Sequence, residues 1–329
     1  MTRSATSLNL EARLFRLSMV RRVDRWLQVM PHPAVVIEVA QNHIAGARWD
    51  SSGKQLVSAA IEALPPGSLM PSPVDTNITQ PEAVRSAFRS VLSRVLDNGA
   101  PIALLIPDPV VRLFILPFES LTRRRQDALP LLRWRLKKSV PFDVEETVLS
   151  WTRQPDKNGN LEVVTAVARQ RIIREYEEIA ESTGAQSVVA VSSTLATLPL
   201  LEAHGATLLV RICGKTLATV IVRDSKFCVY RATEIRAEAA LLDPQAVLEE
   251  IFPAIAYYQD TWGAPLDRVR ISGFGAREQL FREALAGELK VPADPLADAE
   301  GAQHFDAPGK DMIRQGHDAL AGWAMNGGS

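Results

Sequence analysis

The order of predicted elements in this chain of 329 residues repeats itself, and this repetition limits the fold more than any other feature. In the first copy, apolar and polar residues alternate with the period of a β-strand, which predicts three short strands at residues 34–40, 44–50 and 55–64. A helix begins at Pro81, and a continuous apolar run at 102–106 predicts a buried strand. The second copy has the same order, with strands at 208–212, 216–222 and 227–233, a helix over 244–262 and a strand at 269–271.

A different unit separates the two copies. Residues 111–116 predict a strand and 123–139 a basic helix, and a hairpin is predicted over 148–153 and 161–168 because Asn158-Gly159 is a strong turn signal. A helix over 170–182 completes a β-α-β-β-α insertion. A duplicated core with such an insertion is the organisation of the actin-like ATPase superfamily. We therefore expect an α/β protein with the actin-like (ribonuclease H-like) fold.

These elements divide the chain into four parts. They are a basic amphipathic helix (1–30), a first actin-like half (31–107), the inserted subdomain (108–186) and a second half with a closing helix (187–329). Within the last part, the stretch 291–308, rich in Pro, Asp and Ala, predicts a loop. Residues 312–325 predict a single helix.

The composition excludes several classes of protein. The 37 basic and 38 acidic residues nearly cancel, which argues against nucleic-acid binding by bulk charge. Cys213 and Cys228 are too few for a zinc cage or a disulfide framework, and the five histidines show no ligand spacing, so no metal site is predicted. No stretch approaches the roughly 18 apolar residues that span a bilayer. We expect a soluble protein of a reducing compartment.

The first thirty residues depart from this neutrality. They hold six arginines and two acidic residues, and their apolar residues recur at helical spacing, so they predict a basic amphipathic helix. Two interpretations stay open: the helix packs on the protein or on a neighbouring subunit, or it lies on an anionic membrane surface. In the second interpretation Phe15 and Trp26 enter the lipid, and Arg16 and Arg22 face the phosphates.

Several segments resemble, in the right order, the PilM family of type IV pilus assembly proteins. Residues 132–150, LRWRLKKSVPFDVEETVLS, resemble the RWE…IPF…EE stretch of that family. Other landmarks are IPDP at 106–109, VRDSKF at 222–227, YYQ with PLDRVRISGFG within 257–275, and ALAGWA at 319–324. The resemblance covers roughly residues 33–326. The family is related to the cell-division protein FtsA and to the cytoplasmic component of type II secretion systems.

The resemblance implies a non-catalytic cytoplasmic scaffold, peripheral at the inner membrane. Such a scaffold grips the cytoplasmic N-terminal peptide of a PilN-like membrane protein and links it to the pilus motor or other cytoplasmic assembly components. An anionic membrane surface and further copies of the chain are additional expected partners, and nucleic acid is not. The resemblance also implies that the peptide groove lies between the insertion and the first three strands.

We expect five residues at or near this groove: Arg133, Trp134, Lys137, Pro141 and Phe142. The alternative is that the basic residues form a solvated helix face, as most charge runs do. In that case Trp134 and Phe142 belong to the core.

The two hairpins that hold phosphates in actin-like ATPases are degenerate in this chain. Each normally begins with an acidic residue that is followed two positions later by glycine. Here Glu38 is followed by Ala40, while Arg211 and Cys213 replace both residues of the second hairpin. Because Arg211 cannot coordinate Mg²⁺, we expect no ATP hydrolysis and no catalytic residue.

Residual ATP binding stays open, although no cofactor is predicted. The residues of such a degenerate cleft would be Glu38, Lys215, Gly273 and Gly275. The two glycines equally fit a strand-to-helix turn, since a lone G-x-G is a weak signal.

Two other functions remain as alternatives. One is a nucleotide-hydrolysing actin-like ATPase or kinase, against which Arg211 and Cys213 argue. The other is an FtsA-like, membrane-tethered protein that polymerises. FtsA carries its amphipathic anchor at the C-terminus, whereas the basic helix here lies at the other end. The choice between a pilus and a secretion system stays open.

Overall fold

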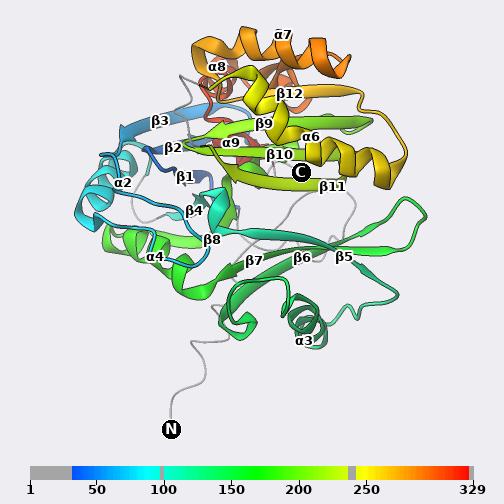
Figure 1. Ribbon diagram of the computed structural model, residues 1–329. Helices are drawn as coiled ribbons and strands as arrows, with labels where there is room; N and C mark the ends of the chain where they lie inside the picture. The colour runs from blue at the N-terminus through cyan, green and yellow to red at the C-terminus, as the bar shows by residue number, and fades with distance from the viewer. Residues whose placement is uncertain (1–31, 97–99, 236–241, 326–329) are drawn as a thin grey trace.

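The structure is a computed structural model that describes residues 32–96, 100–235 and 242–325 (Figure 1). The predicted helix over 1–30 lies outside these residues, together with Phe15, Arg16, Arg22 and Trp26. Among the described helices, none is both long enough and apolar enough to cross a membrane.

The first half is built on a mixed five-stranded sheet in the order β3-β2-β1-β4-β8. The predicted strands of the first copy are confirmed as β1 (Val35–Val39), β2 (His43–Trp49), β3 (Leu56–Ala63) and β4 (Pro101–Ile106). The first three strands are antiparallel, and β4 runs parallel to β1. Strand β8 (Gln186–Ser192), which follows the insertion in the chain, pairs in parallel with β4 and extends this first sheet.

The second half repeats this sheet in the order β11-β10-β9-β12-β13. Its strands are β9 (Ala206–Cys213), β10 (Thr216–Arg223), β11 (Lys226–Glu234), β12 (Arg268–Ser272) and β13 (Ala293–Pro295). Again three antiparallel strands are followed by parallel ones. The two sheets therefore share one topology, and the predicted duplication is confirmed.

Helices cover each sheet because their apolar residues recur on one face. On the first sheet, α2 (Pro81–Val95) begins with proline in its first turn and buries Phe88 and Val91. On the second sheet lie α6 (Pro244–Trp262) and α7 (Glu278–Leu289) (Figure 1). The Asp243 side chain accepts a hydrogen bond from the Gln245 backbone N–H and caps α6.

The insertion forms a three-stranded sheet in the order β5-β7-β6, with one helix on its outer face. Its elements are β5 (Arg112–Phe118), α3 (Arg125–Leu136), β6 (Thr147–Pro155), β7 (Leu161–Arg169) and α4 (Gln170–Ser182). Alternate residues of β7 point to opposite faces. Ala166 and Ala168 pack into the core of the first half, while Val163 and Val167 pack with residues of α3. Helix α3 therefore covers the face turned away from the first half (Figure 1).

Two predictions near the C-terminus were wrong. The stretch 291–308 is not a plain loop, because it contains β13 and two short 3-10 turns, Leu296–Asp298 and Gly301–His304. Residues 312–325 do not form one helix but end α8 (Ala307–Arg314) and form α9 (Asp318–Met325). The break lies at Gly316, whose φ of 87° is left-handed and ends a helix.

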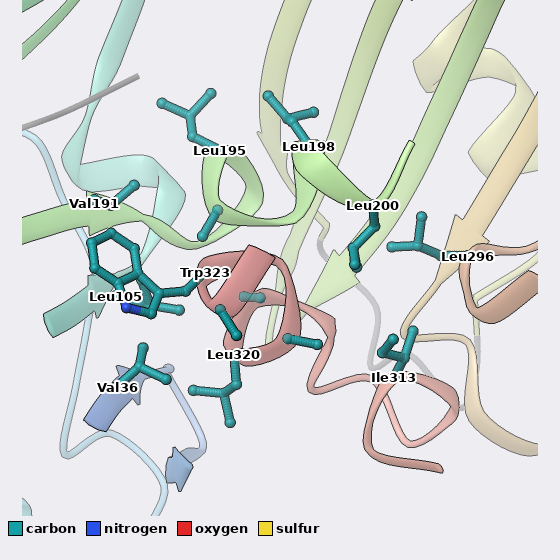
Figure 2. Packing of buried hydrophobic residues seen from close by; sticks show 14 of the residues in the cluster. Val36, Leu105, Val191, Leu195, Leu198, Leu200, Leu296, Ile313, Leu320 and Trp323 are labelled. Atoms are coloured by element: carbon teal, nitrogen blue, oxygen red, sulfur yellow. The ribbon is translucent and has the colours of Figure 1, made fainter. Parts of the chain in front are cut away.

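Helix α9 returns the end of the chain to the first half and joins the two cores. Figure 2 shows Leu320 and Trp323 of α9 within one apolar cluster that also holds Val36 and Leu195. Gly322 allows the close approach of α5 (Ser193–Thr197), because a Cβ there would lie 2.1 Å from the Ala196 carbonyl oxygen. The Trp323 indole donates a hydrogen bond to the Pro33 carbonyl at 3.0 Å. The start of β1 and the end of α9 are thus fixed to each other.

Candidate functional site

The turns of the two corresponding hairpins touch each other. One turn joins β1 to β2 and the other joins β9 to β10. The Lys215 backbone N–H donates a hydrogen bond to Gln41 Oε1 at 3.2 Å. Gly214, with a φ of 60°, lies against Gln41, so that a Cβ there would be 3.0 Å from the Gln41 Cβ. The two halves therefore meet where the resemblance places the phosphate-binding hairpins.

Directly behind these turns, Arg211 is fully buried among three carboxylates. Its Nε donates to Asp318 Oδ2 at 2.8 Å, and its Nη2 donates to Glu38 Oε1 at 3.1 Å. Its Nη1 donates to Thr194 Oγ1 at 3.3 Å and lies 3.9 Å from Asp108 Oδ2. The four charged side chains are at most 1% exposed. We call Arg211, Glu38, Asp108 and Asp318 the Arg211 cluster.

Hydroxyl groups donate hydrogen bonds to the three carboxylates of the cluster. The Ser193 hydroxyl donates to Glu38 Oε1, and the Ser272 hydroxyl donates to Asp318 Oδ1 at 3.0 Å. Asp108 accepts from the Ser192 hydroxyl and, at 2.6 Å, from the Thr194 hydroxyl. Because each acid has a fixed partner, the cluster binds β1, the 3-10 turn Asp108–Val110 after β4, β9 and the start of α9 together.

Burial and charge act against each other in this cluster. Burial raises the pKa of Asp318, and Arg211 offsets only part of that shift. For Glu38, burial also favours the neutral acid, but Arg211, His43 and the Ser193 hydroxyl outweigh it, so its pKa is lowered overall. Despite its burial, Arg211 has a pKa well above the ordinary value because Asp318 and the other acids surround it. The guanidinium is therefore charged.

Little space is left beside the cluster. The hollow lined by Glu38, Asp108, Ser193, Cys213 and Thr216, among others, has a volume of about 10 Å³. That volume is at the lower limit for one water molecule. The guanidinium and its partners fill the position at which an acid and a metal would face phosphates.

The four residues predicted for a nucleotide-binding cleft do not form one site in the structure. Glu38 belongs to the Arg211 cluster, whereas the side chain of Lys215 is exposed. Gly273 has a φ of 83°, and a Cβ there would lie 1.9 Å from the Ile212 carbonyl oxygen of β9. Gly275 has a φ of 54° and no other atom within 4 Å of such a Cβ. Close backbone packing therefore accounts for Gly273 without a nucleotide.

Two histidines lie next to Glu38, and the sequence did not predict that they would meet there. The rings of His43, at the start of β2, and His317, in the turn before α9, are T-shaped with centroids 5.1 Å apart. Ligand atoms of Glu38, His43 and His317 all lie within 4.8 Å of one another. No local spacing in the sequence signals this group, because Glu38 and His43 lie near the start of the chain and His317 near its end.

The predicted partner-binding residues lie on α3 and the turn that follows it. Trp134 is 73% exposed, so the alternative that it belongs to the core is wrong. Phe142 is half-buried beside Leu136 and Val144.

The other three residues lie at the surface to different degrees. Arg133 pairs with Glu145 at 3.2 Å, and Lys137 and Pro141 are exposed. Because α3 covers the outer face of its sheet, these residues do not line a groove between the insertion and the first three strands.

Strands β2 and β3 do border a different hollow. Its volume is about 280 Å³, and Leu56 and Ile61 of β3 lie on one wall. Met312 and Pro308 of α8 lie on the other. The insertion takes no part in its lining.

Comparison with known proteins identifies the fold of the chain. No protein-family model and no curated protein matches the sequence. Among solved structures, the chain is similar to a chain of the PilM-PilN type IV pilus biogenesis complex, with a TM-score of 0.72 and 19% identity, over 91% of this chain and 100% of that chain. It is also similar to a protein with actin-like ATPase fold and unknown function from Bacteroides thetaiotaomicron (TM-score 0.51, 8% identity, 87% and 95% covered).

A third match is the cytoplasmic domain of EpsL, an inner membrane component of the type II secretion system of Vibrio cholerae (TM-score 0.46, 10% identity, 72% and 80% covered). The chain therefore has the actin-like ATPase fold, and over nearly its whole length it is arranged like a chain of the PilM-PilN complex.

Proposed function

We propose that this chain is a non-catalytic actin-like scaffold of a type IV pilus or related secretion complex, peripheral at the cytoplasmic face of the inner membrane. It binds the cytoplasmic N-terminal peptide of a PilN-like membrane protein. The similarity to a chain of a PilM-PilN complex supports the choice of partner. The observation that carries the non-catalytic role is the buried Arg211 cluster.

The cluster opposes metal-dependent phosphate chemistry in two ways. A guanidinium stands where the acid that holds Mg²⁺ would stand, and a guanidinium has no lone pair to offer a metal ion. It also engages one oxygen of Glu38 and one of Asp318, so a metal cannot bind at those two oxygens without breaking buried ion pairs. The hollow of about 10 Å³ leaves no room for a triphosphate unless the two halves separate.

Titration with ATP and Mg²⁺ is expected to give neither micromolar binding nor phosphate release. Isothermal titration calorimetry and a phosphate assay measure these two quantities, and an actin-like ATPase serves as the positive control. Should weak binding occur through the predicted cleft, Lys215→Ala abolishes it. Micromolar binding together with turnover would overturn the non-catalytic role.

For the partner surface we propose the outer face of α3. Trp134 is 73% exposed and Leu131 47% exposed on this helix. The side chains of Arg135 and Lys137 beside them are also exposed. Large exposed aromatic residues are frequent binding hot spots, and cations around them attract an acidic peptide.

Trp134→Ala is expected to weaken binding of the PilN-like peptide at least about tenfold, because the variant removes the apolar anchor. Fluorescence polarisation with a labelled synthetic peptide measures the affinity, and a scrambled peptide controls for charge. Tyr257→Ala is the matched control, since Tyr257 is 58% exposed on α6 of the other half. It should leave the affinity unchanged.

Two results would contradict this proposal in different ways. If Trp134→Ala binds normally while Ile61→Asp does not, the peptide occupies the hollow between β3 and α8 instead. If the unmodified chain fails to bind the peptide at about 100 μM, weaker than ordinary specific recognition, the PilN-like partner is wrong.

A further inference from the structure

Three atoms of metal-binding side chains, one each from Glu38, His43 and His317, lie together beside the Arg211 cluster. They are Glu38 Oε2, His43 Nε2 and His317 Nδ1, each buried and each without a hydrogen-bond partner among the described residues. Glu38 itself is fully buried, and its other oxygen takes the hydrogen bonds from Arg211 and Ser193. Buried polar atoms without a partner are costly, and a cation between them removes that cost when both imidazoles present a lone pair to it.

The protonation of His43 is fixed by its neighbour. Its Nδ1 lies 2.8 Å from Asn42 Oδ1, which can only accept, so Nδ1 carries the proton. Nε2 then presents its lone pair toward Glu38 and His317. Metal-binding histidines commonly have this arrangement, in which the second ring nitrogen donates to an oxygen outside the site.

The surrounding charge also favours a divalent cation. Among the described residues, the Arg211 cluster sets one guanidinium against three carboxylates at most 1% exposed. Two negative charges are left over when all three acids are ionised. A dication next to Glu38 neutralises them at short range, in a medium where charges interact strongly.

We propose that Glu38, His43 and His317 form a binding site for a first-row divalent transition metal ion, with Zn²⁺ as its natural occupant. Two imidazoles and one carboxylate are a known zinc ligand set that leaves one position for water. Hard Mg²⁺ prefers an all-oxygen shell and does not compete. The proposal does not depend on the proposed function, because the peptide surface on α3 lies on the insertion.

The three ligand atoms must move only slightly closer together to coordinate a zinc ion. Tetrahedral zinc with bonds near 2.0–2.1 Å places its ligand atoms about 3.4 Å apart. The three ligand atoms now lie within 4.8 Å of one another, so rotation of the imidazole rings brings them into range. His317 also lines the hollow between β3 and α8. Once bound, the ion links the first hairpin to the turn before α9.

The test uses the untagged full chain after removal of metal with a chelator. Calorimetric titration with Zn²⁺ is expected to give one ion per chain at micromolar or tighter affinity, and Mg²⁺ no binding. Co²⁺ should produce the visible absorption bands of a tetrahedral site with nitrogen ligands. His43→Gln and His317→Gln should each weaken Zn²⁺ binding at least about a hundredfold, and Asn42→Ala about tenfold, as for a residue that orients a ligand.

His204→Gln and His304→Gln are the matched controls, because both side chains are exposed and lie outside the group of three. They should bind Zn²⁺ like the unmodified chain. Circular dichroism verifies that each variant is folded, and His317→Gln, in a turn, serves if His43→Gln is not. The proposal is overturned if the unmodified chain takes up no Zn²⁺ at about 100 μM, or if the control substitutions weaken binding as much as His317→Gln. Peptide binding, measured separately, is unaffected by either result.

Discussion

Replacing Arg211 by methionine is expected to lower the free energy of unfolding by about 3–5 kcal/mol, as the loss of one partner from a buried ion pair does. Methionine fills much of the volume but leaves Glu38 and Asp318 buried without their cation. Urea unfolding at neutral pH, followed by circular dichroism, measures the loss. Because the cluster joins both halves, the whole cooperative transition should shift.

Two controls separate the effect of charge burial from the loss of any ion pair. Arg231 pairs with Glu250 at 3.4 Å, but both side chains are more than 40% exposed. Arg231→Met should therefore cost less than about 1 kcal/mol. Adding Glu38→Gln and Asp318→Asn to Arg211→Met should recover part of the loss, because neutral side chains tolerate burial better than unpaired charges.

The effect of Arg211→Met should also shrink as the pH falls from 7 toward 5. Without the guanidinium, burial raises the pKa of Glu38 and Asp318 in the folded state above their values in the unfolded chain. The folded variant then binds more protons than the unfolded one, so its stability increases at lower pH relative to the unmodified chain. A loss below about 1 kcal/mol that does not depend on pH would mean that the cluster is not a rigid ionic link.

The sequence predicts most of the fold because alternation and turn chemistry act locally. The strands around Asn158-Gly159 lie where that turn signal places them, and α6 begins at Pro244 as predicted. The helix break at Gly316 was missed because the apolar pattern continues through 312–325, and one left-handed glycine overrides it. Strand β13 was missed since it has only three residues and includes a proline.

The candidate site was predictable only in part. Arg211 could be recognised as a charge that replaces an expected acid, but its partners Asp108 and Asp318 could not. They come from the 3-10 turn after β4 and from the start of α9, and only the packing of α9 against the first half brings them together. His43 and His317 meet for the same reason. Contacts between distant segments leave no periodicity or spacing in the sequence.

The second large effect is expected at Gly273. Gly273→Ala should lower the free energy of unfolding by about 3–5 kcal/mol, at the upper end for single substitutions. The added Cβ would lie 1.9 Å from the Ile212 carbonyl oxygen, and this atom belongs to β9 in the middle of the second sheet. A backbone atom of a strand in the packed interior of a sheet cannot move aside cheaply. Guanidinium unfolding of the folded variant measures the cost.

Gly275→Ala separates this clash from backbone strain. Its φ of 54° is left-handed like the 83° of Gly273, but a Cβ at Gly275 meets no other atom within 4 Å. It should cost only about 1–2 kcal/mol, the strain of a left-handed alanine. If Gly273 instead served a nucleotide, both variants would be equally stable and would differ only in ATP binding. A large gap in stability between the two variants therefore assigns the first glycine of this G-x-G to close packing of the turn on β9.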